Sequence, residues 1–222
     1  MNIEQAVERY TTTDSKDLDF LMDMKGSDKG PIWHFYSRFY QTLFEPIRNK
    51  PLSIFELGIG TNNVDISSNM GAHGKPGASL YAWSEFFHDA DIYAADIDKD
   101  CLIEHAKRRI KSYYCDQTDK KVIQELWANE DLSGIQFDIL IEDGLHEPFA
   151  NKIFFEESYQ KVKVGGVYII EDIYYKHEQY FRDLLEKWKT TYPQFVFCFF
   201  EVKVENPVKP QDNWMVVAQR LY

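Results

Sequence analysis

Two acidic pairs and one histidine have the side-chain types of a metal-assisted site that activates a hydroxyl group. Glu142 and Asp143 stand just before His146, and Glu171 and Asp172 form a second pair further along the chain. Four carboxylates and an imidazole suit a hard divalent cation such as Mg²⁺. The cation would lower the pKa of a hydroxyl, and a neutral His146 would accept the proton as general base. The alternative for His146 is a surface histidine that opens a helix.

A second group of residues could hold a cofactor against the backbone. Glu56 is followed by Gly58 and Gly60, and glycines let a ligand approach the main chain closely. A dinucleotide-binding fingerprint needs a third glycine at position 63 with a helix starting at once. This chain has Asn63 there, followed by a long polar segment that extends to residue 77. The pattern therefore disfavours NAD, although a tight turn without any ligand also explains two glycines.

Three polar residues could bind the nucleoside part of a cofactor. Asp96 can accept hydrogen bonds from both hydroxyls of a ribose, or it can cap a helix. Asp98 is the more natural cap for a helix at 99–109, which leaves Asp96 free. Asp116 and Gln117 could contact the polar edge of adenine, or they could form an N-cap pair for the next helix.

Alternating strand and helix patterns position these residues. We expect strands at 52–57, 91–96, 111–115, 137–142 and 167–171, with helices at 79–88, 99–109, 120–128 and 148–162. This alternation is typical of a parallel sheet covered on both faces, the doubly wound α/β fold class. Four of the strands end in acids, which would converge at the carboxyl edge of the sheet. Their repulsion is costly unless positive charge lies among them. The alternative is that each acid only stabilises the start of a helix.

The end of the chain has a different pattern. A helix at 176–190 precedes two strands, 195–202 and 214–220, and the loop 203–213 between them contains two prolines. Because no helix separates these strands, they should pair antiparallel at one end of the sheet.

The start of the chain is predicted to be helical. Segments 3–10 and 33–48 have amphipathic patterns, and a polar loop, 25–31, lies between them. We expect these helices to pack over the open end of the sheet. The whole chain, 1–222, would then be a single domain, with a helical cap at 1–50 and a Rossmann-like core at 51–222.

Composition and charge exclude several classes of protein. The net charge of −11 disfavours nucleic-acid binding, which needs a basic face. The densest basic cluster, 107–109, is interpreted as an ordinary helix end. No apolar run is long enough to span a bilayer, and residues 1–10 lack the apolar core of a signal peptide. We therefore expect a cytoplasmic protein without a membrane segment.

Taken in order, the motifs resemble those of the macrolide and aminocoumarin sugar O-methyltransferases, which include the macrocin, mycinamicin and novobiocin tailoring enzymes. The resemblance covers about residues 25–175, and the joint order and spacing of the motifs is more specific than any one of them. The motifs are Gly-Ser-Asp-Lys-Gly at 26–30, Glu-Leu-Gly-Ile-Gly at 56–60, Gly-Ala-Ser-Leu-Tyr-Ala-Trp at 77–83, Asp-Ile-Asp at 96–98, Asp-Gln-Thr-Asp at 116–119, Glu-Asp-Gly-Leu-His at 142–146 and Gly-Gly-Val-Tyr-Ile-Ile-Glu-Asp at 165–172.

The resemblance implies a Rossmann-like, mostly parallel seven-stranded sheet with an antiparallel C-terminal strand and S-adenosylmethionine as methyl donor. In this family Glu56 and Gly58 would line the methionine side of the cofactor, Asp96 would hold the ribose, and Asp116 with Gln117 would lie near adenine. Ser79 would start a helix near the amino-acid end of the cofactor, and either Ser27 or Asp28 would close over that end. The complete set of implied cofactor-binding residues is Ser27, Glu56, Gly58, Gly60, Ser79, Asp96, Asp116, Gln117 and Glu142.

The resemblance also implies a metal site and a general base. Asp143, Glu171 and Asp172 would bind Mg²⁺, and His146 would be the base, so that Asp143 and His146 form the catalytic pair. The chain departs from the family pattern at Glu142, where an aspartate is usual, and at Leu145, where a serine is usual. These changes bear on the acceptor more than on the cofactor.

The expected function is Mg²⁺-assisted methylation of a hydroxyl on a small, saccharide-containing acceptor. Relatives of this kind often self-associate, so a homo-oligomer is also open. Two alternatives are a nucleotide-sugar or NAD-dependent enzyme on the same fold, and a non-catalytic module that binds S-adenosylmethionine. Fold alone does not decide among them.

Overall fold

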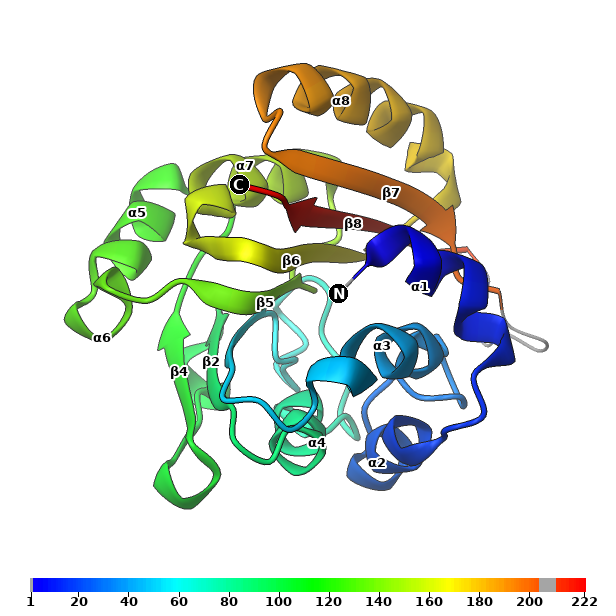
Figure 1. Ribbon diagram of the computed structural model, residues 1–222. Coiled ribbons are helices and arrows are strands. Elements are labelled where there is room, and N and C mark those ends of the chain that lie inside the picture. Colours follow the sequence, from blue (N-terminus) through cyan, green and yellow to red (C-terminus); the bar gives the residue numbers. More distant parts are fainter. Residues whose placement is uncertain (1, 204–210) are drawn as a thin grey trace.

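A computed structural model describes residues 2–203 and 211–222, and this part of the chain contains an eight-stranded sheet (Figure 1). The strand order is β3-β4-β2-β1-β5-β6-β8-β7. The strands are β1 (Ser53–Leu57), β2 (Asp91–Asp96), β3 (Glu104–His105), β4 (Ile110–Tyr114), β5 (Phe137–Glu142), β6 (Val162–Ile173), β7 (Phe195–Glu201) and β8 (Trp214–Arg220). Strands β1, β2, β4, β5 and β6 are parallel, whereas β8 runs antiparallel to both β6 and β7. The predicted fold class and the antiparallel pairing are confirmed.

Helices cover both faces of the sheet because successive strand residues point to opposite sides. On one face, Ile54 and Ile139 pack with α1, α2, α3 and α4, and on the other, Phe55 and Leu140 pack with α5, α7 and α8. The helices are α1 (Ile3–Arg9), α2 (Asp17–Lys25), α3 (Tyr36–Phe44), α4 (Ala78–Phe86), α5 (Lys120–Ala128), α6 (Glu130–Ser133), α7 (Pro148–Ser158) and α8 (Glu178–Thr191). The N-terminal helices therefore pack on one face of the sheet, whereas the prediction placed them over its open end.

The prediction of a helix at 99–109 is wrong, and the strand count is eight where seven were expected. The segment instead forms two short 3-10 turns around β3, which pairs antiparallel with β4. Ser112 fixes this hairpin, since its hydroxyl accepts from the Ile103 N–H at 2.5 Å and donates to the Ile103 carbonyl at 3.0 Å. Consequently the basic cluster 107–109 lies at the hairpin turn, where Arg109 has a φ of 54°, and is no helix end.

The N-terminal region contains a helix, α2, that the pattern did not predict. Gly26 ends it in the left-handed region at φ 86°, and its N–H donates to the Met22 carbonyl at 2.9 Å. The chain then turns toward the sheet, where the Ser37 N–H donates to the Lys29 carbonyl at 2.8 Å. Helix α3 begins at Tyr36, later than the predicted start at residue 33.

In the described part of the chain, no helix is both long and apolar enough to cross a bilayer. The predicted loop 203–213 lies largely outside the described residues, including Pro207 and Pro210.

Candidate active site

A cavity of about 310 Å³ lies at the carboxyl edge of the sheet, where β1, β2 and β5 end. It brings together most of the residues that the motifs singled out. Those that line it are Ser27, Glu56, Gly58, Gly60, Ser79, Asp96, Asp116, Gln117, Asp143 and His146. This edge is also where open parallel sheets bind their ligands.

The glycine turn after β1 packs directly against the end of β5. Gly58 and Gly60 have φ values of 82° and 80°. A Cβ atom on Gly58 would lie 1.9 Å from the carbonyl oxygen of Asp143, and one on Gly60 would lie 2.1 Å from the Met70 sulfur. Gly58 is therefore required by backbone packing as well as by its conformation, whereas Gly60 is required mainly by its positive φ, since the Met70 side chain can move.

We predict that Gly58→Ala destabilises the protein by roughly 3 kcal/mol, because left-handed strain adds to a backbone clash. Gly71→Ala is the matched control, since Gly71 also has a positive φ but no atom lies within 4 Å of its Cβ position. The control should lose only about 1 kcal/mol. Chemical denaturation of both variants checks the prediction, and equal losses would contradict it.

Asp96 is held by the turn that it supports. Its Oδ2 accepts from the Ile59 N–H at 2.8 Å and its Oδ1 accepts from the Asp98 N–H at 2.9 Å. Asp98 caps the short turn at 99–101 by accepting from the Asp100 N–H at 3.0 Å. Asp98 thus takes the capping role predicted for it, and the Asp96 carboxylate lines the cavity.

Glu56 anchors the start of α4 beneath the cavity. Its Oε1 accepts from the Ser79 hydroxyl and its Oε2 accepts from the Trp83 indole N–H, both at 2.6 Å. Burial raises the pKa of Glu56, and the nearby Lys29 ammonium opposes that shift.

Gln117 joins two strand ends. Its Oε1 accepts from the Leu145 N–H at 2.6 Å, and its Nε2 donates to Glu142 at 3.0 Å. Helix α5 is capped by Asp119, so Asp116 and Gln117 are not its N-cap pair. Glu142 is fully buried and bonded to Gln117 and Asn151, and the structure does not bring it to the cavity surface.

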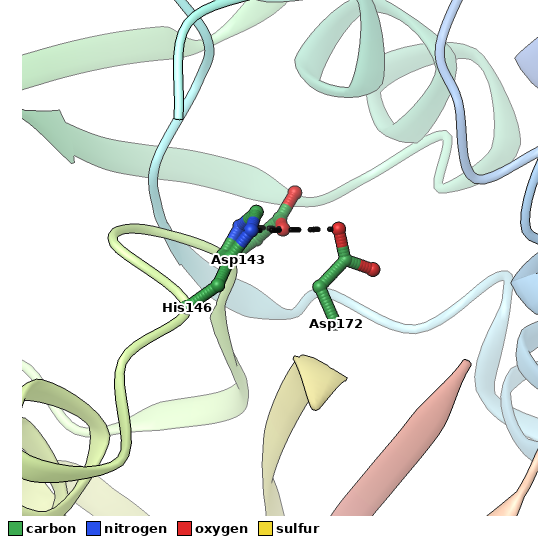
Figure 2. Close-up of side chains that lie close together, drawn as sticks. All are labelled: Asp143, His146 and Asp172. Atoms are coloured by element: carbon green, nitrogen blue, oxygen red, sulfur yellow. Dashed lines mark hydrogen bonds and ion pairs between the residues drawn. The ribbon is translucent and has the colours of Figure 1, made fainter. Parts of the chain in front are cut away.

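Asp143, His146 and Asp172 form a compact group, defined here as the acid centre (Figure 2). The His146 Nε2 lies 3.1 Å from Asp143 Oδ1, and its Nδ1 lies 3.8 Å from Asp172 Oδ2. One ligand atom from each residue lies within 4.8 Å of the others. His146 and Asp172 have φ values of 61° and 53°, the kind of backbone strain that concentrates at functional sites.

Electrostatics favour a protonated imidazole in this group. Burial alone would lower the pKa of His146, but the hydrogen bond to Asp143 and the charge of Asp172 outweigh it and raise the pKa to about 10. Burial likewise opposes ionisation of Asp143, yet the Lys29 charge and the His146 hydrogen bond hold its pKa below the ordinary value.

Sequence reasoning missed the positive charge at the centre of the acids, which is Lys29. Its side chain is 2% exposed, and its Nζ is paired with Asp143 Oδ2, with Glu171 Oε2 at 2.5 Å and with Glu56 Oε1 at 3.8 Å. Glu171 therefore faces Lys29, whereas Asp172 faces His146. The convergence of acids at the strand ends was the signal for such a cation.

Two buried tyrosines of α3 complete the set. The Tyr36 hydroxyl donates to Asp172 Oδ1 at 2.6 Å, and the Tyr40 hydroxyl donates to Glu171. Burial and the adjacent carboxylates raise the pKa of both tyrosines, which stay neutral donors. The helical cap thus reaches the acids that end β6.

The fold is that of the methyltransferase class. The structure of MycE, a methyltransferase from the mycinamycin biosynthetic pathway in complex with Mg and S-adenosylhomocysteine (SAH), matches with a TM-score of 0.70 and 22% sequence identity. The match covers 92% of this chain and 54% of that chain.

Sequence comparison narrows the resemblance. The chain is 30% identical over 168 residues to 8-demethyl-8-(2-methoxy-alpha-L-rhamnosyl)-tetracenomycin-C 3'-O-methyltransferase of Streptomyces olivaceus, covering 75% of this chain and 39% of that protein. It is 30% identical over 166 residues to demethylmacrocin O-methyltransferase of Streptomyces fradiae, and this match covers 73% of this chain and 38% of that protein. The resemblance predicted from the motifs is confirmed, although the chain spans only about two fifths of the length of these relatives. No protein-family model matches the chain.

Proposed function

We propose that this protein is an S-adenosylmethionine-dependent O-methyltransferase that acts on a hydroxyl of a small, sugar-containing metabolite. The observation that carries the proposal is that one cavity joins the predicted cofactor residues to Asp143 and His146. A methyl donor bound beside Asp96 and Glu56 would therefore share its space with a general base. The sequence relatives named above are O-methyltransferases, and one of them is named for a rhamnosyl-bearing compound.

The charge of the cavity suits this cofactor better than NAD. Six acids line it, whereas the lysines that line it are Lys29, which is already paired with acids, and Lys75. A cationic sulfonium and ammonium fit such a surface, and a pyrophosphate would be repelled by it. The missing third glycine at Asn63 points the same way.

The acid centre fits a divalent cation. Asp143 and Asp172 present hard oxygen donors beside His146, within 4.8 Å of one another. We propose that Asp143 and Asp172 hold Mg²⁺. Glu171, the third metal ligand implied by the resemblance, is paired with the Lys29 ammonium, so its carboxylate would join the site only if that pair opened. When bound, the cation would supply positive charge that lowers the pKa of nearby hydroxyl and imidazole groups.

The proton-accepting role of His146 requires a neutral imidazole, whose protonation state the neighbouring acids control. In chelator-treated protein we expect the imidazole to remain protonated at neutral pH and to titrate near pH 10, against an ordinary pKa of 6.5. Added Mg²⁺ should lower this pKa, because its charge offsets those of Asp143 and Asp172. NMR of the histidine ring protons, assigned with His146→Gln, checks this. An ordinary pKa without metal would contradict it.

The first test is calorimetric titration of chelator-treated protein with SAH, with and without Mg²⁺. Micromolar binding supports the proposed cofactor and justifies a screen of glycosylated acceptors for methyl transfer. Binding without turnover on any acceptor would favour the non-catalytic module. No binding in either condition would reject the proposal and return attention to nucleotide-sugar ligands.

We also propose that residues 1–222 form a single domain and that the protein acts in the cytoplasm. The net charge of −11 disfavours nucleic-acid partners. Self-association is checked by sedimentation of the full chain.

A further inference from the structure

Lys29 occupies a position that packing alone does not explain. It is a nearly completely buried lysine, and its ammonium group contacts carboxylates at the ends of three strands, β1, β5 and β6. Lysine is almost never fully buried unless it is paired. Removing one partner of a buried ion pair leaves an uncompensated charge, which is strongly destabilising.

Without Lys29, the four carboxylates near it would outnumber the His34 and His146 imidazoles that lie beside Asp143 and Asp172. Glu56, Asp143, Glu171 and Asp172 are all closely spaced, and the first and third of these are at most 1% exposed. Hydroxyl donors from Tyr40 and Ser79 satisfy some of their oxygens but bring no charge. Among the described residues, Lys29 is the lysine that is paired with three of the four acids.

Lys29 also fixes the direction of Asp143. The Oδ2 of Asp143 is bound to the ammonium group, which leaves Oδ1 facing His146 Nε2 at 3.1 Å. Lys29 itself is anchored by its main chain, whose carbonyl accepts from the Ser37 N–H of α3. The orientation of the imidazole is thereby linked to the N-terminal helices.

We propose that Lys29 is a positioning residue, a built-in counter-cation that keeps the acid centre assembled and Asp143 directed at His146 before any metal binds. The catalytic purpose of the acid centre rests on the proposed function. The pairing of Lys29 with the acids does not depend on that function. It follows that an added divalent cation should replace part of what Lys29 supplies when the lysine is removed.

The test compares melting temperatures of chelator-treated full-length variants, with and without Mg²⁺ as the probe. Lys29→Met should melt roughly 10 °C below the wild type, the shift expected when a buried pair is broken in a chain of this size. The double variant Lys29→Met with Glu171→Gln removes Lys29 together with one of the carboxyl groups paired with it, and should recover about half of that loss. Magnesium should raise the melting temperature of Lys29→Met more than that of the wild type.

Lys161→Met is the matched control, because Lys161 is a partly buried lysine bound to the carbonyls of Leu132 and Ser133, just before the start of β6 and so at the opposite end of that strand from Glu171. Its change in melting temperature should be independent of Mg²⁺. If Lys29 merely fills space, its variant will behave like this control, and the second substitution will bring no recovery. Either result overturns the proposal.

If Lys29→Met does not fold, the comparison of this variant with the double variant still decides the question. A double variant that folds where the single variant does not supports the proposal, whereas two unfolded chains overturn it, since charge balance would not be what Lys29 supplies. Failure of the proposed function has a separate signature. If the wild type does not bind SAH, the proposed function fails, and the melting temperatures of the Lys29 variants still test the role of Lys29 because they are measured without SAH.

Discussion

His146→Ala is expected to lower methyl transfer by roughly 10²–10⁴-fold, the usual contribution of a general base. The imidazole lines the cavity beside Asp143, so its loss removes the group that would accept the hydroxyl proton. The affinity for SAH should stay close to that of the wild type, because the predicted ribose and methionine contacts come from Asp96, Glu56 and Ser79. Transfer from labelled cofactor to an acceptor found in the screen, together with calorimetry, checks both parts.

His105→Ala serves as the control for this substitution. His105 lies on the short edge strand β3 and packs against Tyr81, outside the acid centre. It should retain wild-type transfer. Wild-type turnover in His146→Ala would remove the base role, and a parallel loss of SAH affinity would show that the histidine shapes the cofactor site instead.

The sheet and the acid positions could be predicted because both depend on local pattern. Apolar strands alternate with helices, and the acids Glu56, Asp96, Asp143 and Asp172 each lie within one residue of the end of a strand. A parallel sheet then brings those ends together whatever the helices do. For this reason the convergence of Asp143 and Asp172 followed from topology alone.

The cation among those acids could not be located by the same reasoning. Lys29 belongs to a polar loop, and such loops normally lie on the surface. Its burial depends on the turn at Gly26 and on the bond from Ser37 to its carbonyl, which are contacts within the N-terminal region. Only the cost of unpaired carboxylates indicated that some positive group had to be there.

In the segment 99–109, the local pattern predicted a helix, but strand pairing with β4 determines the structure instead. Its composition is compatible with a helix, and Asp98 does cap its first turn. The bonds of Ser112 to Ile103, with the β3–β4 pairing, instead tie the segment to the sheet edge. Helix propensity is a weak prior that tertiary contacts readily override.

Asp96→Asn should weaken SAH binding, and Asp96→Ala should weaken it by roughly 10–150-fold, which corresponds to about 1.5–3 kcal/mol for hydrogen bonds to a charged acceptor. The two substitutions differ in their effect on the fold. Alanine leaves the Ile59 and Asp98 N–H groups without their acceptor, so it should also lower the melting temperature. Asparagine keeps one carbonyl oxygen and the side-chain shape, and should cost less stability.

This difference separates a ribose-binding carboxylate from one that only holds a turn. Asp98→Asn is the control, because Asp98 is an acid of the same turn that accepts from Thr61 and Asp100 and does not line the cavity. It should bind SAH as the wild type does. If Asp96→Asn also binds SAH with unchanged affinity, the carboxylate serves the glycine turn alone. If its affinity falls as far as that of Asp96→Ala while its melting temperature stays well above that of the alanine variant, the lost charge was in contact with the ligand, which locates the ribose at the end of β2.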